Sequence, residues 1–99
     1  MYHHIVLLRL RGLDEDFHVR VAECVAQLRA ELPFVRSYDF VRNKSRHASG
    51  YEWAVISSFD TQEDRDRYQI SQAHRKIEEF MKPYIDDLIV CDAAVGAQP

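Results

Sequence analysis

The sequence predicts an α+β domain in which four strands and two helical regions follow the order βαββαβ. Two observations predict this fold: segments with alternating apolar residues are interleaved with segments of helical period, and 99 residues are enough for one domain. Right-handed crossovers in this order give a four-stranded antiparallel sheet with both helices on one face. We therefore expect a single domain over residues 1–99, with its core at about 3–95.

The first strand is predicted over residues 3–11. Val6 and Leu8 lie on one of its faces, and Ile5 and Leu7 lie on the other. Apolar side chains on both faces are typical of a strand that is covered on both sides.

The first helix is predicted over residues 14–32, where apolar residues recur at steps of three and four. The acidic residues 14–16 suit its positive N-terminal end, and Pro33 ends it. A second strand is predicted over residues 34–42, and the polar segment 43–50 is predicted to be a connection.

The second half of the chain predicts a third strand, a broken helical region and a last strand. Residues 51–59 alternate as a strand. Thr61 can cap one helix, and Ser71 can cap a second, shorter one. Pro83 ends that helix, and residues 87–95 give the fourth strand.

Helices on one face leave the other face of the sheet uncovered, although the first and third strands carry apolar residues on both faces. The simplest cover is the same face of a second chain, which closes two sheets into a barrel. The pattern therefore predicts a homodimer.

The composition argues against several classes of partner. The net charge of −3 gives no attraction for a polyanion, so we expect no nucleic-acid partner. No apolar run approaches the roughly 18 residues of a membrane helix, so we expect no membrane partner. Cys24 and Cys91 stand in apolar stretches and are predicted to be reduced core thiols of a cytoplasmic protein, with a disulfide or metal pair as the alternative.

Tyr68 and His74 are the candidate catalytic pair. They are six residues apart, so on one unbroken helix they point to different sides, whereas a break at Ser71 lets them converge. A histidine can take a proton near neutral pH, and a phenol can donate a hydrogen bond to a carbonyl oxygen. His4 shares a strand face with Val6 and can join the pair from the sheet. The same spacing also fits a structural contact in which the tyrosine hydroxyl bonds to the histidine.

No metal site is expected. His3 and His4 point to opposite faces of their strand, so they do not form a chelating unit, and no further ligand stands at a suitable spacing. The basic segment from Arg42 to His47 fits an anion-binding loop, but a solvated connection or a dimer contact is the favoured interpretation.

Several motifs in a fixed order carry a family resemblance. They are the opening strand HIVLLRL, RNKS before GYEWAVISSF, Tyr68 with the AH of residues 73–74, KP at residues 82–83, and LIVCD near the end. Together they resemble the stress-responsive dimeric α/β-barrel (Dabb) domain family over roughly residues 3–95. The resemblance implies a homodimer of ferredoxin-like protomers.

One enzyme of that family is a plant polyketide cyclase of the olivetolic acid type, which performs an aldol condensation without cofactor or metal. By resemblance, His74 is the base that removes a carbon-bound proton, Tyr68 orients the carbonyl, and the first-strand histidine is His4. The pocket-lining aliphatic residues fall at Val6, Leu8 and Val55. The resemblance thus implies a cofactor-free cyclase or isomerase that acts on a small, partly apolar carbonyl compound.

The chain also departs from the cyclase pattern. It has SQAH where the cyclase-like segment reads HPAH, and Val21 and Val25 stand where the cyclase pocket takes aromatic residues. A changed pocket wall implies a changed ligand. Two alternatives stay open: a non-catalytic stress-response or ligand-binding dimer, and a barrel similar to cofactorless monooxygenases and haem-degrading enzymes. The haem alternative uses Asn43, Trp53 and His74, although Asn43 is expected in a loop.

Overall fold

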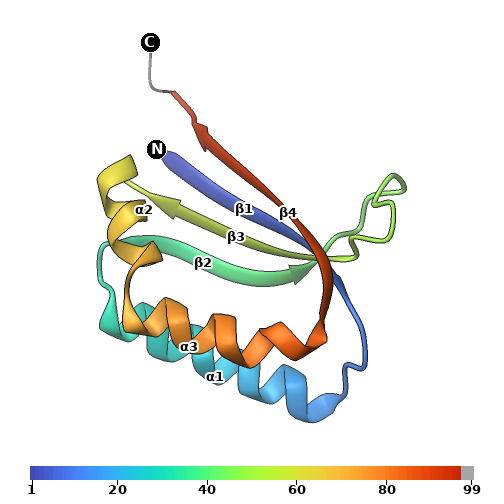
Figure 1. Cartoon of the computed structure of the whole chain (residues 1–99). Coiled ribbons are helices and arrows are strands. Elements are labelled where there is room, and N and C mark those ends of the chain that lie inside the picture. Colours follow the sequence, from blue (N-terminus) through green and yellow to red (C-terminus); the bar gives the residue numbers. More distant parts are fainter. Residues whose placement is uncertain (97–99) are drawn as a thin grey trace.

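A computed structural model describes residues 1–96 and has the predicted βαββαβ order (Figure 1). The strands are β1 (Tyr2–Leu10), β2 (Val35–Arg42), β3 (Trp53–Phe59) and β4 (Ile85–Ala94). The helices are α1 (Glu15–Glu31), α2 (Gln62–Gln69) and α3 (Gln72–Met81), and a 3₁₀ turn, η1 (Lys82–Tyr84), leads into β4. The ferredoxin-like α+β prediction is confirmed.

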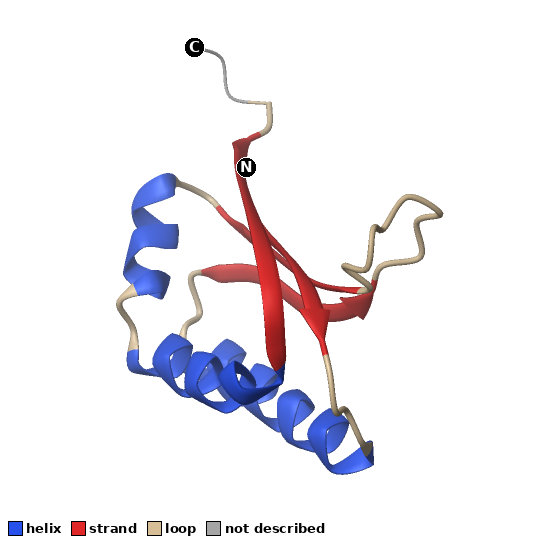
Figure 2. Cartoon of the chain, turned by 45° about the vertical axis from the view of Figure 1, so that its right-hand side comes forward, coloured by secondary structure: helices blue, strands red, loops and turns tan. Residues whose placement is uncertain are grey.

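The four strands form one antiparallel sheet in the order β2-β3-β1-β4. The helices lie on one side of this sheet and leave its other side bare (Figure 2). Because β1 is an inner strand, its residues 2–8 each have a partner on both sides: His4 lies opposite Ser57 and Asp92, and Val6 lies opposite Val55 and Val90. This register positions the candidate site.

An aromatic cluster holds α1 and α3 against the sheet. The ring of Phe17 is fully buried and contacts the rings of Phe40, Phe80 and Tyr84 at centroid distances of 4.7 to 5.8 Å. Burial of one such side chain stabilises the fold by about 1.5–3 kcal/mol. Asp14 caps α1 by accepting a hydrogen bond from the backbone N–H of Phe17 at 2.8 Å, so the same turn both starts the helix and places its main anchor.

The predicted break between Tyr68 and His74 is confirmed. Ser71 is the N-cap of α3, and its hydroxyl accepts a hydrogen bond from the backbone N–H of His74 at 3.1 Å. The same hydroxyl donates to the backbone carbonyl of Tyr68 at 2.7 Å. One serine therefore ends α2, starts α3 and fixes the change of direction between them.

The face of the sheet that points away from the helices, here called the open face, carries an apolar patch. Ile5 pairs with Ile56 across β1 and β3, and Leu7 pairs with Ile89 across β1 and β4. Ile56 is 40% exposed and Ile89 is 48% exposed in the single chain. Large apolar side chains in one continuous patch are typical of an interaction surface.

The prediction that both cysteines are core thiols is wrong for Cys91. Cys24 is half-buried in α1, whereas Cys91 is exposed on β4, and neither forms a disulfide in the described part of the chain. The apolar run around Cys91 belongs to an edge strand, which has a neighbour on one side only. Within residues 1–96, no helix is long and apolar enough to cross a membrane.

Candidate functional site

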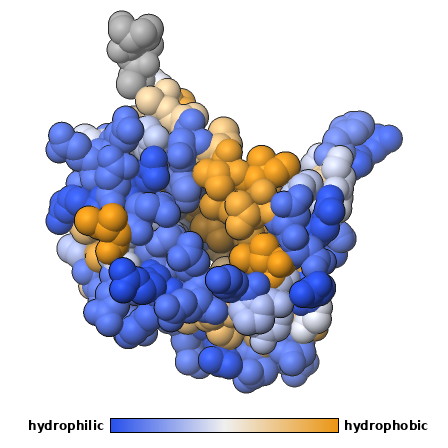
Figure 3. Space-filling view, viewed as in Figure 1, coloured by the Kyte–Doolittle hydropathy of each residue, from blue (hydrophilic) through white to orange (hydrophobic). Residues whose placement is uncertain are grey.

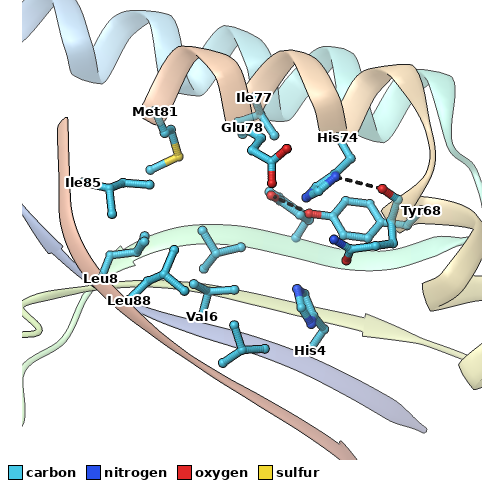
Figure 4. Close-up of a pocket in the computed structure, with 14 residues that line it drawn as sticks. His4, Val6, Leu8, Tyr68, His74, Ile77, Glu78, Met81, Ile85 and Leu88 are labelled. Carbon is cyan, nitrogen blue, oxygen red and sulfur yellow. Dashed lines mark hydrogen bonds between the residues drawn. The ribbon is translucent and has the colours of Figure 1, made fainter. Parts of the chain in front are cut away.

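A cavity of about 180 Å³ lies between α3 and the half of the sheet formed by β1 and β4. Figure 3 shows a hollowed apolar area on the surface of the molecule. Leu88 and Val90 of β4 line the cavity, and both are more than 40% exposed. The candidate catalytic residues and the candidate aliphatic lining residues lie along this cavity: His4, Val6, Leu8, Val55, Tyr68 and His74. The cavity has an apolar side and a polar end, and the polar end holds the candidate pair (Figure 4).

His74 presents one free ring nitrogen. Its Nδ1 lies 3.0 Å from the backbone carbonyl oxygen of Gln69. A carbonyl oxygen only accepts, so Nδ1 carries the hydrogen of the neutral ring and Nε2 keeps its lone pair. Burial lowers the pKa of His74 below its ordinary value of 6.5, against a smaller opposing effect of Glu78. At neutral pH the ring is therefore an unprotonated base.

Tyr68 lies beside His74 but bonds elsewhere. The two ring centroids are 4.7 Å apart in an edge-on contact. The hydroxyl of Tyr68 pairs instead with the hydroxyl of Tyr38, at 3.1 Å. Burial raises the pKa of Tyr68 far above its usual value of 10, so the phenol stays protonated and can donate a hydrogen bond. The arrangement differs from the structural alternative in which the tyrosine hydroxyl bonds to the histidine.

His4 approaches the polar end from the sheet. Its side chain is 7% exposed, and its Nδ1 donates to the carboxylate of Asp92 at 2.5 Å. The second oxygen of Asp92 lies 3.4 Å from the guanidinium of Arg65. The carboxylate thus orients the imidazole of His4, whose ring lies 6.0 Å from the ring of Tyr68.

Four polar residues of the site were missed by reasoning from the sequence: Asp92, Glu78, Tyr38, and Gln69, whose backbone carbonyl contacts Nδ1 of His74. Asp92 lies opposite His4 in the β1–β4 register, which antiparallel pairing of the first and last strands would have indicated. Glu78 follows His74 by one helical turn, so its spacing was a usable signal. Tyr38 lines the cavity from β2, and no signal in the sequence singled it out.

A second groove of about 590 Å³ lies between α1 and β2. It is lined by Val21 and Val25, the positions compared with the aromatic wall of the cyclase pocket, and by Trp53. Val21 and Val25 do not line the first cavity, so the wall implied by the resemblance at these two positions is not part of it. Tyr38 lines both spaces and forms a wall between them.

The haem-type trio is not assembled in the described structure. His74 lines the first cavity and Trp53 lines the second groove. Asn43 lies after β2, where its side-chain amide donates to the backbone carbonyl of Tyr51 at 2.8 Å. Residues 1–96 contain no group of three or more His, Cys, Asp or Glu side chains arranged to hold a metal ion.

Solved structures of similar fold include two dimeric ferredoxin-like proteins of unknown function and one enzyme. The protein from Thermobifida fusca is 24% identical, with a TM-score of 0.79, 95% of this chain covered and 90% of that chain. The protein from Jannaschia is 19% identical, with a TM-score of 0.82 and coverages of 95% and 98%. The enzyme is a hydroxynitrile lyase from Passiflora edulis, 16% identical, with a TM-score of 0.81 and coverages of 99% and 96%. No curated protein matches the sequence significantly.

The model of one protein family matches nearly the whole chain. It is described as the stress responsive A/B barrel domain, and the match covers residues 2–95. The motifs that suggested this resemblance span the same residues. The chain belongs to the stress-responsive A/B barrel domain (Dabb) family.

Proposed function

We propose that this protein is a cofactor-free enzyme that removes a carbon-bound proton from a small, partly apolar carbonyl compound, and so promotes cyclisation or isomerisation. One observation carries the proposal. The Nδ1 of His74 is held by the carbonyl of Gln69, which leaves Nε2 as the free base in an apolar cavity beside the Tyr68 phenol.

In the proposed reaction, Nε2 of His74 takes the proton from the carbon next to the carbonyl group. Negative charge moves onto the carbonyl oxygen, where the Tyr68 hydroxyl donates a hydrogen bond to it. In an isomerisation, the resulting imidazolium returns the proton to carbon or oxygen. In a cyclisation, the enolate carbon attacks a second carbonyl, and the imidazolium protonates the alkoxide that forms. A correctly positioned general base raises the reaction rate by about 10²–10⁴-fold, and one hydrogen-bond donor to the developing oxyanion raises it by about 10²–10³-fold.

Deuterium exchange tests this proposal even while the natural product of the reaction is unidentified. A panel of small neutral ketones is incubated with the protein in D₂O, and loss of the α-proton signal is followed by NMR. We expect exchange to fall at least about 100-fold in His74→Gln and in Tyr68→Phe, since each removes one contribution. The matched control is His18→Gln, because His18 lines the second groove and not the cavity.

A non-catalytic ligand-binding protein is the second candidate. It is favoured by the hydroxyl of Tyr68, which already has a partner in Tyr38. In that case a ketone raises the melting temperature as its concentration rises above its dissociation constant, but no His74-dependent exchange accompanies binding. The likeness to a hydroxynitrile lyase supports the enzyme, because a lyase is carried by the same fold.

We also propose that the chain forms a homodimer through its open face. The support is the continuous apolar patch of Ile5, Leu7, Ile56 and Ile89, together with similar solved proteins that are dimeric. A 99-residue domain buries a modest share of its surface alone, so a second copy adds to its stability.

A further inference from the structure

The cavity is small, and no lysine or arginine side chain is among the described residues that line it. Its volume of about 180 Å³ is close to that of an engineered cavity of about 150 Å³ that accepts benzene. Proteins hold carboxylates and phosphates with lysine and arginine side chains, so this cavity lacks the usual anchor for an anion.

The polar end of the cavity carries a carboxylate instead. Glu78 extends from α3 toward the cavity, on the same side as His74 (Figure 4). Among the ion pairs of the described residues, none includes Glu78, whereas Asp92 is paired with both His4 and Arg65. The negative charge of Glu78 acts on two groups that line the cavity. It contributes to the raised pKa of Tyr68, and it opposes the lowering of the pKa of His74.

The second groove has the opposite character. Arg29, Arg42 and His18 line it, and the guanidinium of Arg42 lies 5.0 Å from the centre of the Trp53 ring, which stacks on Phe40. The absence of cations from the first cavity is therefore local and does not reflect a shortage of basic residues in the chain.

From this arrangement we infer that Glu78 makes the cavity selective for an uncharged carbonyl compound, about one six-membered ring in size, over the carboxylate of the same shape. This ligand class is the substrate class of the protein on the basis of the proposed function. The selectivity has a physical basis that is independent of catalysis. A bound carboxylate loses part of its hydration, meets the charge of Glu78, an exposed residue at the polar end of the cavity, and finds no lysine or arginine among the described lining residues.

Acetophenone and benzoate form a matched pair of test ligands, because they share a ring and a carbonyl group and differ in charge. Binding to the full chain is measured at neutral pH by NMR titration of backbone amides, with shifts at His74 and Val6 reporting the cavity. We expect acetophenone to bind roughly tenfold or more tightly than benzoate. Glu78→Gln is expected to reduce this preference at least about threefold, because it removes the charge and keeps the shape.

Glu79→Gln is the matched control, since Glu79 is the next residue on α3 and is exposed like Glu78, but does not line the cavity. It should leave the preference unchanged. Equal or tighter binding of benzoate, the same preference in Glu78→Gln as in the unaltered protein, or no binding of either ligand at its solubility limit would each overturn the inference.

The two proposals fail separately. If acetophenone binds with the expected preference but His74 promotes no deuterium exchange, the ligand class stands and catalysis falls. If ketones exchange in a His74-dependent manner while benzoate binds equally well, catalysis stands and the role of Glu78 falls.

Discussion

The hydroxyl oxygens of Tyr38 and Tyr68 lie 3.1 Å apart, and both residues are at most 3% exposed. Each hydroxyl has one proton, so only one of them donates within the pair. When the Tyr68 hydroxyl donates its proton to a ligand carbonyl, the hydrogen bond within the pair is kept only if the Tyr38 hydroxyl donates to the oxygen of Tyr68. Tyr38 is then a positioning residue, which aims the Tyr68 hydroxyl at the ligand from the wall between the two cavities.

The tyrosine pair gives a first prediction. Tyr38→Phe and Tyr68→Phe should each lower the free energy of unfolding by about 1–2 kcal/mol, because each leaves a buried hydroxyl without its partner. The double variant should cost about 1 kcal/mol less than the sum of the two. Urea unfolding of the four proteins measures this coupling, and strictly additive losses would show that the hydroxyls do not interact.

Ser71 gives a second prediction, in which stability and site geometry separate. Ser71→Ala should cost about 1 kcal/mol, since it removes the cap of α3, and it should also shift the NMR signals of the His74 ring. Thr61→Ala is the control, because Thr61 caps α2 by accepting from the backbone N–H of Asp64. It should lower stability by a similar amount and leave the His74 ring signals in place. Unchanged His74 signals in Ser71→Ala would contradict this account of the helix break.

The pair of His4 and Asp92 gives a third prediction. Asp92→Asn should lower the free energy of unfolding by about 1–3 kcal/mol, since it weakens a charge-assisted hydrogen bond to a buried ring and leaves Arg65 without that partner. Asp86→Asn is the surface control, because Asp86 pairs with Arg11, whose side chain is 68% exposed. It should change stability by less than about 1 kcal/mol. Equal effects of the two substitutions would mean that Asp92 acts only as a surface charge.

The open face gives a fourth prediction. Ile56→Asp places a charge within the apolar patch and should convert the dimer to a monomer in light scattering after gel filtration. Val19→Asp is the control, because Val19 is 56% exposed on α1, on the other side of the sheet. It should leave the mass at that of a dimer. A monomeric unaltered protein, or a dimeric Ile56→Asp variant with a native circular dichroism spectrum, would place the contact elsewhere.

The fold follows from the sequence because its signals are local. Proline at residue 33 and the caps at Asp14, Thr61 and Ser71 mark the ends of the helices, and alternation marks the strands. The convergence of Tyr68 and His74 also follows, since it depends on one serine between them. These features do not depend on how distant segments pack.

Other features of the site depend on packing between segments far apart in the chain. The contact of Asp92 with His4 requires the register of the first and last strands, and the tyrosine pair depends on β2, where a register shift between Val35 and Ser37 sets which residues face the helices. The exposure of Cys91 depends on strand order, because an apolar run has the same sequence in an inner strand and in an edge strand.

The account depends on the state of the His74 ring. Because burial lowers its pKa below 6.5, the fold favours the neutral ring. This contribution to stability is complete above pH 6.5 and is lost as the pH falls through the lower pKa of the folded protein. The acid limb of any exchange activity should therefore also lie below pH 6.5.

The most direct test is an NMR titration of the ¹⁵N-labelled imidazole rings, with His74→Gln used to assign the signals of His74. The account predicts that at neutral pH the hydrogen of His74 is on Nδ1 and Nε2 is unprotonated, and that the ring titrates with a midpoint below 6.5. A hydrogen on Nε2 at neutral pH, or a midpoint at or above 6.5, would contradict it.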